Sequence, residues 1–183
     1  DPETMEDIRC TMERQTQQLI MLVDDLLDVS RISKGKLKLR KCRVKLADVI
    51  QSAVEASNSF IVESNHQLIT AIPTEPIYLD ADPNRLAQVV SNLLNNSIKY
   101  TPEGGHIRLS AERQGTDVIV SVEDNGLGIP AEMLDRIFEM FAQIDRPQEK
   151  GYTGLGIGLS LVKSPVEMHA GKIEVHSEGI GKG

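Results

Sequence analysis

The stretch that decides the fold reads Glu123-Asp124-Asn125-Gly126-Leu127-Gly128-Ile129-Pro130. It directly follows residues 117–123, where Val118, Val120 and Val122 alternate with other residues as in a strand. Glycines after a strand-end carboxylate let the backbone approach a flat ligand, and Asp124 can accept a hydrogen bond from an exocyclic amine such as that of adenine. An Asn-Gly hairpin turn is the alternative. The next segment does not alternate, because Pro130 opens a helix, and this favours a ligand-binding turn.

Upstream, residues 82–100 are predicted to form a helix, because Asp82 is a good N-cap and Pro83 suits the first helical position. One face is mainly apolar and consists of Leu86, Val89, Val90, Leu93 and Ser97. Another face is polar at helical spacing and consists of Arg85, Asn92, Asn96 and Lys99. Amide oxygens can ligate a metal ion, and a lysine can attract phosphates. Taken alone, the polar face is also what an ordinary solvated helix would show.

Downstream, two further segments stand out. Residues 137–141 read Ile-Phe-Glu-Met-Phe and hold two of the three phenylalanines, which suits a helix end packing into the core or an anchor for the irregular stretch that follows. Residues 154–159 read Gly-Leu-Gly-Ile-Gly-Leu, preceded by Gly151. Glycines leading into a helix can cradle a phosphate, since free N–H groups and the helix dipole favour an anion. Residues 142–153 would then form a lid, and a plain flexible loop is the alternative.

Residues 3–33 are predicted to form one long helix that ends near Ser33-Lys34-Gly35, the first domain boundary. Its seam follows a 3-4 spacing through Met5, Ile8, Met12, Gln15, Leu19, Leu22, Leu26 and Val29. A second stripe of Ile20, Val23 and Leu27 lies beside it. A lone helix cannot bury both stripes, so partner helices are expected outside this segment.

The rest of the chain mixes helices with short strands. The expected elements are strand pieces in 36–45, a helix in 46–64, strands in 68–72 and 77–80, a hairpin of 106–113 and 117–123, a short helix in 130–138, a helix in 156–169 and a strand in 172–176. This order predicts an α+β fold, a two-layer sandwich in which helices cover a mixed, mostly antiparallel sheet.

Composition excludes several classes of protein. The chain has 183 residues, 40% of them hydrophobic, which argues against disorder. A net charge of −7 disfavours nucleic acid as a partner, and the seven basic residues of 34–45 are interpreted as a solvated face. Cys10 and Cys42 are isolated, as in a reducing compartment. No apolar run reaches the length of a membrane span, so we expect a cytoplasmic fragment without membrane contact, whatever anchor its parent protein carries.

The order of these segments resembles the N, G1, F and G2 boxes of the sensor histidine kinase catalytic domain, a member of the wider Bergerat-fold ATPases. Residues 22–31, Leu-Val-Asp-Asp-Leu-Leu-Asp-Val-Ser-Arg, resemble the second helix of the family's dimerisation and phosphotransfer hairpin. The resemblance covers nearly the whole chain. It implies that residues 1–34 are this second helix, with the hairpin incomplete, and that residues 35–183 are the ATP-binding catalytic domain, whose last strand is expected to be truncated.

The resemblance also implies cofactors and binding residues. ATP and Mg²⁺ would bind here, with Asn96 as the metal ligand and Asp124 reading adenine. The nucleotide-binding residues that it implies are Asn92, Asn96, Lys99, Tyr100, Asp124, Gly126, Gly128, Ile129, Phe141, Gly154, Leu155, Gly156, Gly158 and Leu159. The implied activity transfers the γ-phosphoryl group of ATP to a histidine and then to an aspartate of a response-regulator receiver domain, in a homodimer formed through the hairpin.

The sequence departs from this family pattern in three places. The acceptor histidine usually lies in a His-[Glu/Asp]-Leu-Arg setting, which His66, His106, His169 and His176 all lack, so no catalytic residue is assigned and the acceptor is expected upstream of Asp1. Pro165 is expected to kink or end the helix after the G2 box. The chain also stops where the family usually adds a strand, which predicts an unpaired sheet edge.

Two other functions fit parts of the same pattern. An ATP hydrolase of the same superfold would need a glutamate one turn before the metal-binding asparagine as a general base, and Asn92 holds that place. A dimerisation module that binds nucleotide only as a regulator would fit the heptad seam and the missing histidine. The fate of the label from labelled ATP would distinguish the kinase, the hydrolase and the dimerisation module.

Overall fold

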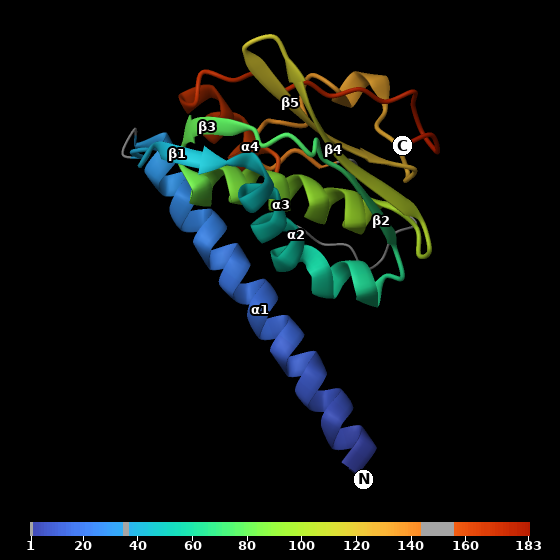
Figure 1. Cartoon of the computed structure of the whole chain (residues 1–183). Helices are drawn as coiled ribbons and strands as arrows, with labels where there is room; N and C mark the ends of the chain where they lie inside the picture. Colours follow the sequence, from blue (N-terminus) through green and yellow to red (C-terminus); the bar gives the residue numbers. More distant parts are fainter. Residues whose placement is uncertain (1, 35–36, 144–155) are drawn as a thin grey trace. The chain divides into compact units, whose positions relative to one another are not determined.

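The structure is a computed structural model that describes residues 2–34, 37–143 and 156–183. The chain divides into two compact units, Asp1–Lys38 and Leu39–Gly183. The first unit is the long helix α1, Pro2–Ser33, which confirms the prediction of one helix over residues 3–33 (Figure 1).

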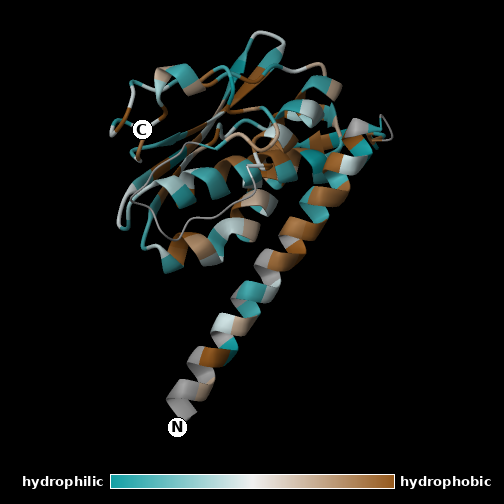
Figure 2. Ribbon diagram, turned by 180° about the vertical axis from the view of Figure 1, so that it is seen from behind, coloured by the Kyte–Doolittle hydropathy of each residue, from teal (hydrophilic) through white to brown (hydrophobic). Residues whose placement is uncertain are grey.

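Apolar side chains on α1 are exposed. Figure 2 shows hydrophobic residues recurring along the helix. The exposed ones include Met5, Ile8, Met12, Leu19, Ile20, Val23, Leu26 and Leu27. They come from both predicted stripes, which are therefore still available for burial against a partner.

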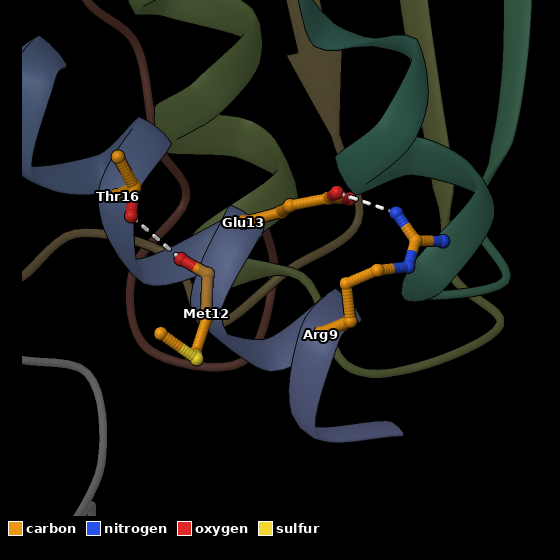
Figure 3. Close-up of polar contacts among 4 residues, drawn as sticks. All are labelled: Arg9, Met12, Glu13 and Thr16. Atoms are coloured by element: carbon orange, nitrogen blue, oxygen red, sulfur yellow. Dashed lines mark hydrogen bonds and ion pairs between the residues drawn. The ribbon is translucent and has the colours of Figure 1, made fainter. Parts of the chain in front are cut away.

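Two polar contacts on α1 run along the helix itself. In Figure 3 the guanidinium of Arg9 pairs with the Glu13 carboxylate one turn later, and Thr16 Oγ1 donates a hydrogen bond to the Met12 carbonyl at 2.8 Å. Exposed side-chain pairs at this spacing contribute only a few tenths of a kcal/mol, about 0.2–0.5. These contacts support the helix locally and leave its apolar stripes uncovered.

The second unit contains the remaining helices and strands. Its elements are β1 Cys42–Lys45, α2 Leu46–Glu63, β2 Gln67–Ala71, β3 Tyr78–Ala81, α3 Pro83–Tyr100, β4 His106–Gln114, β5 Asp117–Asp124, the 3₁₀ turn η1 Ala131–Met133 and α4 Ser160–Met168. The described strands form two sheets, β1–β3 and β2–β4–β5. β2 and β4 are parallel, whereas the other two pairings are antiparallel. The mixed, mostly antiparallel α+β class is confirmed.

One hydrophobic core lies between the helices and the three-stranded sheet (Figure 1). Its buried residues are Leu46, Ile50, Ala53 and Ile61 from α2, Val90, Leu94 and Ile98 from α3, and Ile107, Leu109 and Ala111 from β4. The alternation of β4 puts these three side chains on one face of the sheet. Val118, Val120 and Val122 of β5 pack against the same cluster, so the predicted hairpin presents its apolar face to α2 and α3.

Asp82 begins α3 and joins it to two other segments. Its Oδ1 accepts hydrogen bonds from the N–H groups of Asn84 and Arg85, both at 3.2 Å, and its Oδ2 accepts one from the N–H of Arg40 at 2.8 Å. The N–H of Asp82 donates to His169 Nε2 at 2.9 Å, and His169 Nδ1 donates to the Pro165 carbonyl at 2.7 Å. In this arrangement Nε2 of His169 is the acceptor and Nδ1 is the donor.

Four local predictions were wrong in whole or in part. The helix expected over 130–138 is only the short turn η1, and the one expected over 156–169 begins at Ser160, because Gly156 has a φ of +68° that a right-handed helix cannot hold. Pro165 does not end α4, which continues to Met168 with the proline ring buried. Residues 172–176 form no strand. Their alternating pattern defines an apolar and a polar face, but a strand also needs a neighbouring strand to pair with, and the pattern does not supply one.

No helix in the described part of the chain combines the length and the apolar character that a membrane crossing requires.

The cap of α3 leads to a test of stability. Burial raises the pKa of Asp82, but hydrogen bonds from three backbone N–H groups and the charge of Arg85 outweigh burial, so its pKa lies below the ordinary value of 3.8. Its carboxylate therefore stabilises the fold fully above about pH 4 and loses this effect as the pH falls through the lowered pKa. We expect Asp82→Ala to lower the free energy of unfolding at pH 7 by about 1–2 kcal/mol in urea denaturation.

The difference between Asp82→Ala and the parent chain should shrink when the same titration is repeated near pH 3. Asp82→Asn, which keeps a capping oxygen, should lose less than the alanine variant at pH 7. Glu103→Ala, at an exposed carboxylate, serves as the control. Equal unfolding free energies for the parent and Asp82→Ala at pH 7 would show that the cap does not stabilise α3.

Candidate nucleotide-binding site

Helix α3 connects two of the segments that the sequence singled out. Its Ser97 Oγ donates a hydrogen bond to Asp124 Oδ2 at 2.9 Å, at the end of β5. One turn and a half earlier, Asn92 Nδ2 donates to the Gly158 carbonyl at 3.4 Å, just before α4. The helix thus contacts the turn after β5 and the glycine segment before α4 at the same time, which brings the polar groups of all three together.

The Asp124 carboxylate is held by donors on both oxygens. Oδ2 accepts from Ser97, and Oδ1 accepts from the N–H of Gly126 at 3.0 Å. Each carboxylate oxygen has a second lone pair, so Asp124 can still accept a hydrogen bond from a ligand. A carboxylate in this state has no proton to donate, and it therefore favours an amine over a carbonyl as its partner.

Gly126 lies where no side chain fits. A Cβ atom at this position would come within 2.4 Å of the Tyr100 carbonyl oxygen. That carbonyl accepts a hydrogen bond from the N–H of Leu127 at 3.0 Å, which holds the turn after β5 against the end of α3. The glycine is therefore required for the close approach of these two backbones.

Asn96 has the chemistry of a magnesium ligand. Its Nδ2 donates to the Asn92 carbonyl at 2.9 Å, so its oxygen Oδ1 is the atom that can face a cation. A Cβ atom added to Gly158 would lie 3.5 Å from Asn96 Nδ2, which places this side chain beside the glycine segment. In the described part of the chain no three His, Cys, Asp or Glu side chains are grouped to hold a metal. A single amide oxygen together with nucleotide phosphates fits Mg²⁺, which keeps few protein ligands.

The glycine segment before α4 is partly described. Gly156 has a φ of +68°, and its carbonyl accepts a hydrogen bond from the N–H of Phe141 at 2.9 Å. Phe141 itself has a φ of +64° and is 63% exposed, so its ring is not part of the core. Gly154, Leu155 and most of the proposed lid, residues 144–153, lie outside the described residues.

The remaining predicted residues lie around the same segments. The Lys99 ammonium lies 4.9 Å from the centroid of the Tyr100 ring, at the end of α3. Gly128 packs against the backbone of Gly179, and the N–H of Ile129 donates to Ser177 Oγ at 2.9 Å. Leu159 is the residue before α4 and supplies no side-chain cap.

The sequence did not identify two residues that contribute to this site, Ser97 and Ser177. Ser97 was placed on the apolar face of its helix without a role, although a buried hydroxyl there needs a hydrogen-bond partner, and this was the available signal. Ser177 also holds the turn, because its Oγ accepts from Ile129 and donates to the Gly183 carbonyl at 2.7 Å. Nothing in the pattern around Ser177 pointed to this contact.

The chain is similar in sequence to known ATP-binding proteins. Residues 81–183 match the model of the family described as histidine kinase-, DNA gyrase B- and HSP90-like ATPases. The alginate biosynthesis sensor protein KinB of Pseudomonas aeruginosa is 36% identical over 175 residues, covering 94% of this chain and 28% of that protein. The chain spans less than half the length of the curated relatives that it matches.

Solved structures show the same likeness. Full-length ShkA in complex with AMPPNP matches with a TM-score of 0.75 and 28% identity over 90% of this chain and 34% of that one. Histidine kinase ThkA in complex with the response regulator protein TrrA matches with a TM-score of 0.66 and 25% identity over 93% of this chain and 46% of that one. The family match covers the helix α3, the turn after β5 and the glycine segment, which are the parts that meet in the site. The chain therefore belongs to the histidine kinase-, DNA gyrase B- and HSP90-like ATPases, within which it has the catalytic ATP-binding domain of the sensor histidine kinases.

Proposed function

We propose that this chain is the nucleotide-binding, catalytic part of a sensor histidine kinase, which transfers the γ-phosphoryl group of ATP to a histidine outside these 183 residues. The observation that carries the proposal is the pair of contacts made by α3, to Asp124 through Ser97 and to Gly158 through Asn92. A ligand held at both contacts would have its base near Asp124 and its phosphates near Gly158.

The proposed roles follow the chemistry of each group. Asp124 accepts a hydrogen bond from the exocyclic amine of adenine, and Gly126 lets the turn come close to the base. Asn96 would hold Mg²⁺, which would neutralise charge on the phosphates. Lys99 attracts the phosphates as a cation. The backbone around Gly156 and Gly158, ahead of α4, presents N–H groups to them. We assign the other predicted residues, Asn92, Tyr100, Gly128, Ile129, Phe141, Gly154, Leu155 and Leu159, to the walls of the same site.

The histidines of this chain are poor candidates for the phosphoryl acceptor. His66 is buried and its Nε2 donates to the carbonyls of Thr101 and Pro102 at 3.0 and 3.1 Å. Both ring nitrogens of His169 are engaged, with Asp82 and Pro165. His106 begins a strand, and His176 lies in a segment without helix or strand. None of the four stands on an exposed helix face.

Transfer rather than hydrolysis is favoured by the residue one turn before Asn96. An ATP hydrolase needs a carboxylate near this point to take a proton from water. Asn92 cannot do so at neutral pH, and its amide is bonded to Gly158. With no general base at this position, the site would act by positioning ATP and neutralising its charge until an acceptor arrives.

The long helix α1 supplies the proposed partner surface. Its exposed apolar stripes are suited to a helical hairpin in a homodimer of the whole protein, with residues 1–34 as the second hairpin helix and residues 35–183 as the catalytic domain. We also infer that the phosphoryl group passes on to a receiver domain, as suggested by the ThkA structure with its response regulator protein. Since ATP is the substrate, we expect this domain to work in the cytoplasm.

A transfer experiment tests the proposed activity. The chain is mixed with γ-labelled ATP, Mg²⁺ and a separate hairpin that carries the cognate histidine. We expect acid-labile label on the hairpin, because phosphohistidine is the product. Release of free phosphate at a comparable rate without any acceptor would replace the kinase with a hydrolase. Absence of ATP binding would leave only a dimerisation module.

A substitution of Asn96 tests the proposed metal ligand. Asn96→Ala is expected to slow transfer on the order of a hundredfold, because Mg²⁺ would lose its ligand from the protein. ATP affinity should be measured with Mg²⁺ and with a chelator. The parent should bind more tightly with Mg²⁺, and the variant should lose this difference.

Asn84→Ala provides a matched control on the same helix, because Asn84 is exposed at the first turn of α3 and only its backbone N–H contacts Asp82. This control should keep the magnesium dependence of the parent. A magnesium effect of equal size in Asn96→Ala would mean that Asn96 does not hold the ion.

A further inference from the structure

Ser97 is a buried serine in the middle of a helix, and it makes an unusual contact. The residue is 6% exposed and lies among Val90, Leu94 and Ile98 on the buried side of α3. A serine inside a helix commonly turns its hydroxyl back to a carbonyl of the preceding turn, as Ser91 does with the Gln88 carbonyl at 3.1 Å. Ser97 instead donates across the fold to Asp124, 27 residues along the chain.

A second buried serine shows that this contact is not an automatic result of burial. Ser57 on α2 is fully buried, and its hydroxyl has no hydrogen-bond partner among the described residues. Packing therefore tolerates a serine without a partner in this core. The hydroxyl of Ser97, by contrast, is aimed at the Asp124 carboxylate.

The two donors to Asp124 come from different elements. Ser97 belongs to α3 and binds Oδ2, whereas the N–H of Gly126 belongs to the turn and binds Oδ1. With one donor on each oxygen, the plane of the carboxylate is fixed about the last side-chain bond. Without Ser97, a single hydrogen bond to Oδ1 would remain, and the carboxylate could rotate around it.

We propose that Ser97 is a positioning residue for base selection, which fixes the Asp124 carboxylate in the orientation that accepts the amino group of adenine. The proposal rests on the function proposed above, in which Asp124 reads the base. A fixed acceptor distinguishes adenine from guanine, because guanine presents a carbonyl where adenine presents an amine, and two acceptors repel. A rotating carboxylate, or a water that replaces the hydroxyl, loses part of this discrimination.

The test measures binding of ATP and of GTP, each with Mg²⁺, to the full chain by titration calorimetry. Four variants are compared: Ser97→Ala, Asp124→Asn, the double variant, and Ser57→Ala as a buried serine outside the site. We expect Ser97→Ala to weaken ATP binding about tenfold, the usual effect of losing a hydrogen bond to a charged group. GTP binding should change little, so the ratio of the two affinities falls.

The double variant separates positioning from packing. If Ser97 acts only through Asp124, removing its hydroxyl should have no further effect on ATP affinity once Asp124 is asparagine. Ser57→Ala should leave both affinities as in the parent. Thermal unfolding is recorded for every variant, and Ser97→Cys, whose thiol is a weak donor of similar shape, replaces Ser97→Ala if the latter does not fold.

Each result decides one point. An unchanged ratio of ATP to GTP affinity in a folded Ser97 variant overturns the proposal, even if its unfolding temperature falls. Fully additive effects of Ser97→Ala and Asp124→Asn overturn it as well, because the hydroxyl then acts elsewhere. If Asp124→Asn binds ATP as tightly as the parent, the adenine-reading role of Asp124 in the proposed function fails together with the role of Ser97.

Discussion

The burial of one face of α3 against the sheet is the interaction on which the catalytic unit depends. Leu94 of this helix and Ile107 and Leu109 of β4 have no exposed surface, and the apolar side of α2 closes the same core. Burying one side chain of this kind contributes roughly 1.5–3 kcal/mol, so the whole cluster contributes far more than any single polar contact in the site. This packing fixes the rotation of α3 about its axis and its position along that axis. It therefore also fixes where every polar group on the helix lies.

Polar contacts then connect α3 to its surroundings at three levels. Asp82 caps its first turn and binds the chain at Arg40 and the end of α4 at His169. Asn92 meets the glycine segment in the middle, and Ser97 meets Asp124 near the end. The Tyr100 carbonyl holds the turn that follows β5. The length of a single helix therefore sets the distance between the base-binding and phosphate-binding ends of the proposed site. Rigid packing of the helix keeps that distance constant.

This arrangement explains why the proposed chemistry needs so few reactive groups. A phosphoryl transfer of this kind depends on placing ATP and on neutralising its charge rather than on a covalent intermediate. Amide oxygens, backbone N–H groups and one lysine are sufficient for such work, and all of them lie on α3 or on loops bonded to it. The acceptor histidine would come from a helical surface that pairs with α1, whose exposed apolar stripes match the heptad spacing of the sequence.

The sequence by itself determined the elements whose signals are local. Asp82 and Pro83 marked the start of α3, Val118 to Val122 marked a strand, and the order of the asparagine helix, the glycine turn and the glycine segment indicated the family. Tertiary structure decided what depends on distant partners: the separation of the strands into two sheets, the late start of α4, the absence of a strand at 172–176 and the contact between Ser97 and Asp124. Alternation and capping act within one or two turns of the chain, whereas a pairing edge or a hydrogen bond across 27 residues exists only after packing has set the register between elements.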